Sequence, residues 1–398
     1  MGRDRFFRLL LVAAVLNLAT SMIHPITPAW IAERKLDDAM FGMMFAAMAA
    51  GGFLAGPLWG RLADRRGRLP AMALGAVGYG AAQLAFGYLH NPVAILAMRF
   101  LGGVMVMGAN AGLMASAIDL TDDRSRAARL AQYAAAVSVA AALGYFSGGL
   151  LGVWSVMGTF YVQAAALLLS AALMMGLLGE TRPAVAAEGQ GTADRTPAKG
   201  RAPRRATMAT ALFFAGVVAA QFGSAGYDNT FNYYLSNALG YPSSVNGIVK
   251  AATGLMGLLA NLTINMWAAR RFRPDRSLAA MLAACAATLA LVPSMRGAAA
   301  FFATNIAFYL FNSMYMPMQQ ALAARDRGAG AGAISGLFNS ARNLGMVAGA
   351  LAAGLAYRVG PALAFYHQAI GFAAAAALTY LSFRRGADIM ERRDNHVV

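Results

Sequence analysis

The chain has 398 residues, of which 59% are hydrophobic and only 13% charged, and its mean hydropathy is +0.52. A soluble domain carries about 25% charged residues, so this composition excludes water as the solvent for most of the chain. The net charge of +16 would suit nucleic-acid binding in a soluble protein. Here the basic residues gather at the ends of apolar segments instead, which is how a membrane protein sets its orientation. We therefore predict a membrane protein that binds no nucleic acid.

A window of about 20 residues, the length that crosses a hydrocarbon core of ~30 Å, finds twelve apolar segments along the chain. The first is too long for the apolar core of a signal peptide, so we expect it to remain as a span. The sequence thus predicts an all-α membrane protein with twelve transmembrane helices. The predicted spans are residues 7–31, 39–59, 69–89, 92–117, 129–151, 154–178, 208–235, 244–268, 277–294, 298–321, 330–354 and 361–383.

A polar stretch rich in Ala, Gly, Pro, Thr and charges divides these spans six and six, and it has no apolar face to bury. Basic loops follow both the second and the eighth span, and glycine runs recur in the fifth and the eleventh, so the halves echo each other as transporter repeats do. We predict two pseudo-symmetric six-helix bundles around a central cavity. The predicted segments are an N-terminal bundle (1–179), a disordered linker (180–207), a C-terminal bundle (208–384) and a tail (385–398).

The basic residues also predict the orientation in the membrane. Of the 33 Lys and Arg residues, 26 lie in the N-terminus, the even-numbered loops and the C-terminus, 4 in the odd-numbered loops and 3 inside spans. Because basic loops stay in the cytoplasm, both termini and the linker are predicted to be cytoplasmic. The high Ala, Gly and Arg content, without a targeting signal, favours a bacterial inner membrane.

The loop after the second span carries five charges and two glycines. Glycine allows a tight turn between antiparallel spans, and Asp64 can face both a helix N-terminus and nearby arginines. The pattern resembles the cytoplasmic loop motif of the major facilitator superfamily, although Leu69 stands where a further basic residue is usual. The motif residues are Gly60, Leu62, Asp64, Arg65, Gly67 and Arg68.

This resemblance covers the full chain by span count and implies a role for the loop. In the family the loop is a conformational latch between the bundles, with an acid at the end of the fourth span as its partner, and Asp119 stands at that position here. The alternative is a loop whose charges only set the orientation.

Two further patterns are similar to those of proton-coupled drug and solute antiporters within the superfamily. Arg99 is followed by glycine three and four residues later, and burying an arginine near a bilayer centre costs at least ~2.5 kcal/mol, so it should face a cavity or a partner. A structural role, bonding neighbouring carbonyls, is the alternative. In the fifth span, residues 144–149 resemble the antiporter signature, with Tyr145 replacing its proline and Ala140 an upstream glycine.

Asp228 is the leading candidate for proton coupling, because of the 17 acidic residues it alone lies well within a predicted span. A carboxylate in a cavity that opens alternately to two sides can load and unload a proton. Lys250 enters the next span at a comparable depth and can pair with it, and Arg99 is the third expected coupling residue. A static ion pair, or Lys250 extending outward to the surface, is the alternative.

Polar side chains repeat on single faces of the seventh and tenth spans, and lipid offers such faces no partners. They are expected to line a substrate cavity, with hydrogen bonds between helices as the alternative. His24 can instead bond locally at a helix end, and Arg342 can be a structural anchor. The expected cavity residues are Asn17, His24, Gln221, Asn232, Asn305, Tyr309, Asn312, Tyr315 and Arg342.

The preferred interpretation is a secondary transporter that works by alternating access, with proton-coupled efflux of a small organic molecule. The alternative is a proton-linked uptake symporter for a small anionic, zwitterionic or hydroxylated solute, because three cations and one acid lie inside spans. The expected partners are this solute, protons and the lipid bilayer.

An enzyme is not expected. The four histidines are scattered, a single cysteine has no partner, and no HExxH, GxSxG or phosphate-binding loop occurs. We therefore expect no metal, no cofactor and no catalytic residues.

Overall fold

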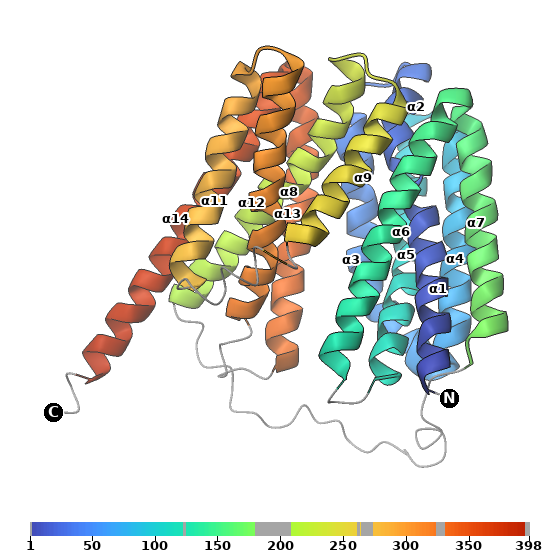
Figure 1. The fold of residues 1–398 in the computed structure, drawn as a ribbon, viewed down its shortest axis with the longest axis horizontal. Helices are drawn as coiled ribbons and strands as arrows, with labels where there is room; N and C mark the ends of the chain where they lie inside the picture. Colours follow the sequence, from blue (N-terminus) through green and yellow to red (C-terminus); the bar gives the residue numbers. More distant parts are fainter. Residues whose placement is uncertain are drawn as a thin grey trace. The chain divides into compact units, whose positions relative to one another are not determined.

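The computed structural model describes residues 2–121, 125–179, 208–260, 263, 274–323 and 331–394, and every regular element in these ranges is a helix (Figure 1). The predicted linker, 180–207, lies outside them. The first half contains α1 (Gly2–Ser21), η1 (His24–Ile26), α2 (Thr27–Glu33), α3 (Met40–Arg66), α4 (Arg68–Tyr88), α5 (Pro92–Asp119), α6 (Arg126–Trp154) and α7 (Val156–Leu177). The second half contains α8 (Met208–Asn237), α9 (Ser243–Ala260), α11 (Pro274–Leu291), η4 (Val292–Ser294), α12 (Ala298–Ala323), α13 (Ala331–Val359) and α14 (Pro361–Asp394).

Each of the twelve predicted spans holds a helix. By length and hydropathy, nine helical stretches in the described ranges can cross a membrane, and the first runs from Asp4 through η1 and α2 to Glu33. Helices α9, α12 and α13 occupy the three other predicted spans. At the far end of the chain, α14 continues to Asp394, so helix extends into the residues predicted as a tail.

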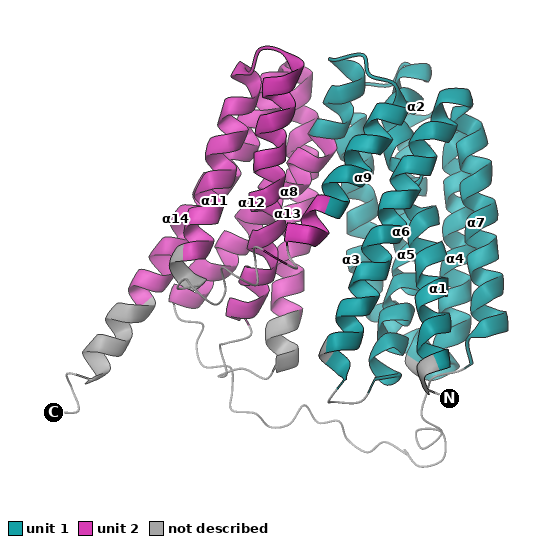
Figure 2. Ribbon diagram, in the orientation of Figure 1, with its two compact units in different colours: residues 1–193, 231–255 teal, residues 194–230, 256–398 magenta. Residues whose placement is uncertain are grey.

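The helices form two compact units (Figure 2). The first unit contains residues 1–193 and 231–255, and the second contains residues 194–230 and 256–398. Helices α8 and α9 therefore each belong partly to both units. These units are defined by which residues pack together, not by position in the chain. The division of the chain into an N-terminal and a C-terminal six-helix bundle therefore stays a prediction.

Within the first unit, α5 packs on α3 and α4, α4 on α7, and α1 on α6. Its core includes the fully buried Leu9, Leu16, Leu113 and Leu167. In the second unit, α11 packs on α12 and α14. Phe308 and Phe372 are fully buried there with their ring centres 5.6 Å apart. Each unit thus has its own apolar interior.

Local signals position the ends of α4 and α5. Pro92 opens α5, and the Asn91 side chain accepts hydrogen bonds from the backbone N–H groups of residues 93 and 94 at 2.9 and 3.2 Å. Beyond the end of α4, the Arg34 Nε donates to the Leu89 carbonyl at 3.0 Å while its guanidinium lies over the Trp30 ring. These contacts satisfy backbone groups that a helix end leaves without partners.

Glycines let α3 and α5 cross at backbone contact. A Cβ built on Gly103 would lie 1.9 Å from the Met48 carbonyl oxygen, and one built on Gly51 would lie 2.1 Å from the Phe100 carbonyl oxygen. Because both obstacles are backbone atoms, no side chain can rotate away to make room. Gly103 belongs to the pattern that begins at Arg99, so this part of the pattern serves helix packing.

We expect Gly103→Ala to destabilise the first unit by about 1–3 kcal/mol, because the added methyl group must push two backbones apart. Thermal unfolding of the detergent-purified protein, followed by tryptophan fluorescence, measures this. The matched control is Gly176→Ala on α7, where no atom lies within 4 Å of the new Cβ. Equal melting temperatures for the two variants would contradict a direct backbone contact between α3 and α5.

Candidate functional site

Asp228 lies in the second unit and is hydrogen bonded to α12. The Tyr309 hydroxyl donates to the Asp228 Oδ1 at 3.3 Å, and the carboxylate is half-buried. On the same stretch of α8, the buried Tyr227 hydroxyl donates to the Asn305 side-chain oxygen. The Tyr227 and Tyr309 rings meet edge to face, with centres 5.4 Å apart. The structure thus joins the predicted polar face of α8 to that of α12, with Asp228 bonded to Tyr309 and the neighbouring Tyr227 bonded to Asn305.

A second polar group joins the same two helices one to two turns away from Asp228. The buried Tyr315 hydroxyl donates to the Gln221 side-chain oxygen at 2.6 Å. Both atoms of the Gln319 amide are buried without a hydrogen-bond partner, and so is the Asn312 Oδ1. On α13, the half-buried Arg342 has a buried Nε that lacks a partner. This group, within the second unit, therefore has donor and acceptor capacity that the described residues leave unused.

Arg99 lies inside the first unit, where its partners are amides. Its side chain is 6% exposed, Nη1 donates to the Gln83 oxygen at 3.1 Å, and the guanidinium lies over the Phe86 ring. The Gln83 amide reaches Gln163 on α7 at 3.4 Å, and Gln163 donates to the Ala19 carbonyl of α1 at 3.0 Å. This chain of hydrogen bonds ties together four helices of the first unit.

Sequence reasoning missed Gln83 and Gln163. Each is a buried amide in an otherwise apolar span, and each is almost fully hidden from solvent. Such an amide needs a polar partner in lipid, and this signal could have found both. The predicted role of Arg99 in proton coupling stays a prediction.

The end of α8 joins the first unit through a separate cluster. The Asn232 amide donates to the His24 carbonyl at 2.8 Å, and the Tyr233 hydroxyl donates to the Asp38 carboxylate at 2.6 Å. Tyr233 also stacks on Phe41, with ring centres 4.7 Å apart. Asn232 and His24, both predicted cavity residues, thus meet through the His24 backbone.

Three more residues with predicted roles, Asn17, His24 and Lys250, lie in the first unit. Asn17 and His24 make contacts within that unit, and Lys250 belongs to a different unit from its expected partner, Asp228. The Asn17 amide donates to the Ala13 carbonyl of its own helix at 2.8 Å. The His24 ring lies edge-on to Tyr145 at 5.7 Å. Lys250 is 6% exposed and belongs to the first unit, whereas Asp228 belongs to the second. Their pairing stays a prediction.

Among the glycines of the fifth span, Gly149 packs against α9, whereas Gly144 and Gly148 pack against the backbone of Leu18 and Met22. The Ser243 hydroxyl donates to the Gly149 carbonyl at 3.0 Å. A Cβ on Gly149 would lie 2.8 Å from the Gly247 Cα, and a Cβ on Gly247 would lie 2.5 Å from the Tyr145 carbonyl oxygen. The antiporter-like pattern therefore provides a surface for close helix packing even with tyrosine at the proline position.

The segment predicted as the latch loop is mostly helical, because α3 continues to Arg66, so the prediction of a loop was wrong there. The segment contains an ion pair. Gly67 has φ of 95°, which only glycine adopts without strain, and it separates α3 from α4. Directly after it, Arg68 pairs with Asp119 at the end of α5. Gly60 has open space around it and Arg65 is exposed, while the Asp64 side chain lies outside the described part. The latch role itself stays a prediction.

The Arg68–Asp119 pair opposes both helix dipoles. Arg68 is the first residue of α4, where an anion is favoured, and Asp119 is the last of α5, where a cation is favoured. Each side chain is also 21% exposed, so the pair contributes little to stability. A pair that stability alone does not explain is a candidate for a conformational role.

A metal site is not apparent in the part of the chain that the structure describes. No group of three or more His, Cys, Asp or Glu side chains is close enough there to hold an ion. The cysteine, Cys285, is fully buried on α11.

Comparison with known proteins decides the family. The model of the Major Facilitator Superfamily matches residues 9–350. The chain belongs to this superfamily. It is therefore a multi-pass membrane transporter and not an enzyme, and the predicted fold class is confirmed.

One relative and several solved structures resemble the transporter over nearly its whole length. Multidrug resistance protein 1 of Bacillus subtilis (strain 168) is 22% identical over 366 residues, which cover 91% of this chain and 92% of the relative. The inward-facing, unoccupied structure of a bacterial homologue of the human lysosomal transporter Spinster has a TM-score of 0.76 at 14% identity, covering 96% and 97% of the two chains. A D-xylose–proton symporter gives 0.68 at 15% identity, covering 95% and 96%.

We expect Gln83→Leu to lower the stability of the transporter by about 2–3 kcal/mol, because the buried Arg99 guanidinium loses its hydrogen-bond acceptor. Gln83→Glu, of equal size, supplies a charged acceptor and should melt no lower than the unmodified protein. Tryptophan fluorescence melting compares the three. If Gln83→Leu melts at the unmodified temperature, the amide network does not hold Arg99.

We expect Asp119→Asn to slow transport while changing stability by less than about 1 kcal/mol, because the pair is partly exposed. The exchanged pair, Arg68→Asp with Asp119→Arg, should recover transport, and it should melt at or above the unmodified temperature because both charges then suit their helix dipoles. Melting curves and initial transport rates in vesicles test this. Unchanged transport by Asp119→Asn would reject a conformational role for the pair.

Proposed function

We propose that the transporter exports a small organic molecule in exchange for protons by alternating access, and that Asp228 carries the proton. The observation behind this proposal is the hydrogen bond from Tyr309 to Asp228, because it joins the one acid well within a predicted span to a polar face of α12. The name of the Bacillus relative, Multidrug resistance protein 1, supports export as the direction.

The surroundings of Asp228 suit reversible protonation. In a medium of low dielectric the charged carboxylate costs more than the neutral acid, so the proton is released only where water or a cation stabilises the charge. The Tyr309 hydroxyl can donate to the carboxylate or accept from the protonated acid. Asp228 can therefore exist in both states without losing its partner on α12.

Lys250 is the proposed competitor for that proton. It is buried on α9, and a buried ammonium group requires an anionic or polar partner. In this proposal Lys250 pairs with Asp228 when the acid is deprotonated and is released when the proton binds. Arg99, enclosed among amides, supports α1, α4, α5 and α7 while the proton exchanges.

The unused polar atoms of the second unit suit a cargo that has hydroxyl, carboxylate or zwitterionic groups. Buried polar atoms without partners cost free energy unless a ligand satisfies them, and Gln319, Asn312 and Arg342 provide such atoms. We propose that the residues predicted to line the substrate cavity contact this cargo. Uptake with protons is the alternative, and the symporter among the similar structures supports it only through a shared fold.

The proposed setting is a bacterial inner membrane with both termini in the cytoplasm. The relative from Bacillus and the distribution of basic residues support this arrangement. The segment from Gly60 to Arg68, which forms the end of α3 and the start of α4, then lies on the cytoplasmic side, where we propose that it latches one conformation.

We expect Asp228→Asn to reduce proton-coupled transport to the level of vesicles without the transporter, because the amide cannot release a proton. Everted vesicles with an acid interior and a pH-sensitive dye report proton loss when solutes bearing carboxylate, ammonium or hydroxyl groups are added. The matched control is Glu33→Gln, which removes one exposed negative charge. Full proton-coupled activity of Asp228→Asn would disprove the assignment.

The same vesicles distinguish export from uptake. Added solute drains protons through an exporter, whereas a symporter drains protons only when the solute has first been loaded inside. Proton loss confined to preloaded vesicles would replace the export proposal with uptake.

A further inference from the structure

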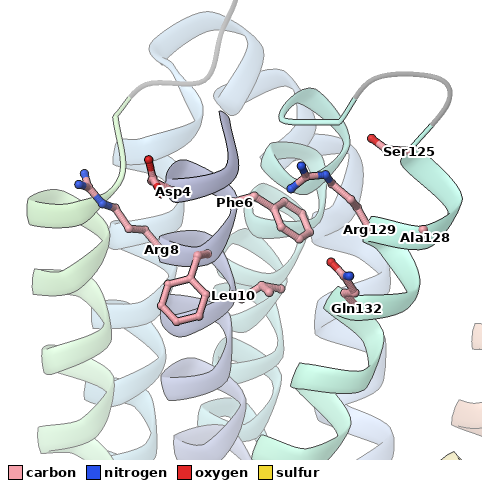
Figure 3. A pocket seen from close by; sticks show the side chains of 9 residues that line it. Asp4, Phe6, Arg8, Leu10, Ser125, Ala128, Arg129 and Gln132 are labelled. Atoms are coloured by element: carbon pink, nitrogen blue, oxygen red, sulfur yellow. The ribbon is translucent and has the colours of Figure 1, made fainter. Parts of the chain in front are cut away.

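A cavity of about 700 Å³ lies where α1 and α6 begin, within the first unit and away from the residues discussed above (Figure 3). Its walls come from the first turns of the two helices. The polar part of the lining consists of Asp4, Arg8, Ser125, Arg129 and Gln132. Its volume is within the range of small-ligand sites.

Arg129 is held in place without an acidic partner. Its guanidinium lies 4.9 Å from the centre of the Phe6 ring, and Phe6 is 2% exposed, so the ring is a fixed support. Figure 3 shows the Arg129 side chain reaching from α6 toward Phe6 on α1. Within the described ranges neither Arg129 nor Arg8 forms an ion pair. Both guanidinium groups therefore keep their hydrogen-bond donors for a ligand.

The other part of the lining is apolar and lies at the boundary of the membrane. The helical stretches that are long and apolar enough to cross a membrane start at Asp4 on α1 and at Ala128 on α6. The cavity therefore lies where the hydrocarbon core meets the lipid head groups. The residues of the apolar part are Phe6, Phe7, Leu10 and Ala128, and Phe7 is 69% exposed. An aromatic side chain this exposed at a span end contacts acyl chains.

We propose that this cavity binds the phosphate-bearing head group of an anionic phospholipid from the adjacent leaflet. Arginine provides paired N–H donors that match phosphate oxygens, and basic pockets between membrane helices bind anionic head groups. Arg129, with Ser125 and Gln132 beside it, contacts the phosphate, while Arg8 attracts the same lipid from α1. Phe7 and Leu10 contact the beginning of its chains.

Native mass spectrometry of the full-length detergent-purified transporter, titrated with dioleoyl phosphatidylglycerol, tests the site. Each arginine is expected to contribute roughly fivefold in affinity, so Arg8→Gln with Arg129→Gln weakens binding about 25-fold. The control is Arg384→Gln with Arg385→Gln, which removes the same charge from exposed positions on α14 and should leave this binding unchanged. Arg129→Gln alone should weaken binding more than Arg8→Gln alone.

Further ligands separate a lipid site from other anion sites. Dioleoyl phosphatidylcholine has the same phosphate, but its choline cation offsets the charge, so it should bind at least tenfold more weakly than phosphatidylglycerol. Soluble glycerol 1-phosphate should not compete, because it lacks chains for Phe7 and Leu10. Competition by glycerol 1-phosphate would assign the cavity to a free phosphorylated solute. If the control pair, Arg384→Gln with Arg385→Gln, lost as much phosphatidylglycerol affinity as the cavity pair, the effect would be one of net charge alone. Either result overturns the proposal, and neither depends on transport.

Discussion

Hydrocarbon offers no hydrogen-bond partner, and this constraint decides where each polar group of the transporter lies. The backbone meets it by forming helices throughout the described ranges. Arg99 meets it in part: Nη1 donates to Gln83, which continues to Gln163 and the Ala19 carbonyl, while the buried Nε has no hydrogen-bond partner among the described residues. At other crossings, such as that of α3 with α5, glycines let the backbones approach directly.

Gln319 departs from this pattern. Among the described residues it is the side chain whose amide donor and acceptor both lie buried without partners. In a rigid soluble core such a group would be a defect, because each unmet atom costs on the order of 1–3 kcal/mol. In the proposed transport function, cargo would supply the missing hydrogen bonds and recover that free energy only while it is bound.

Much of the fold was predictable because a membrane span can be recognised in the sequence by its length and hydropathy. Gly67 and Gly103 also belong to recognisable motifs, and in the structure they occupy positions that only glycine tolerates. The sequence placed Asp228 and Tyr309 on polar helix faces, but the partner it predicted for Asp228 was Lys250, so the hydrogen bond between Tyr309 and Asp228 comes from the structure alone. The partners of Arg99 were not predicted either, since a lone glutamine in an apolar span has no spacing pattern that points to its neighbour. The grouping of residues 231–255 with the first unit depends on contacts between residues about 200 positions apart, such as Asn232 with His24, which no local pattern encodes.

Helix α8 belongs to both units, and the change occurs between Thr230 and Phe231. Asp228 and Asn232 are one helical turn apart, about 6 Å along the axis, yet one bonds within the second unit and the other within the first. The hydrogen bonds of Asp228 and Asn232 therefore fix successive turns of one helix to different units, so one of the covalent connections between the units is a single turn of α8.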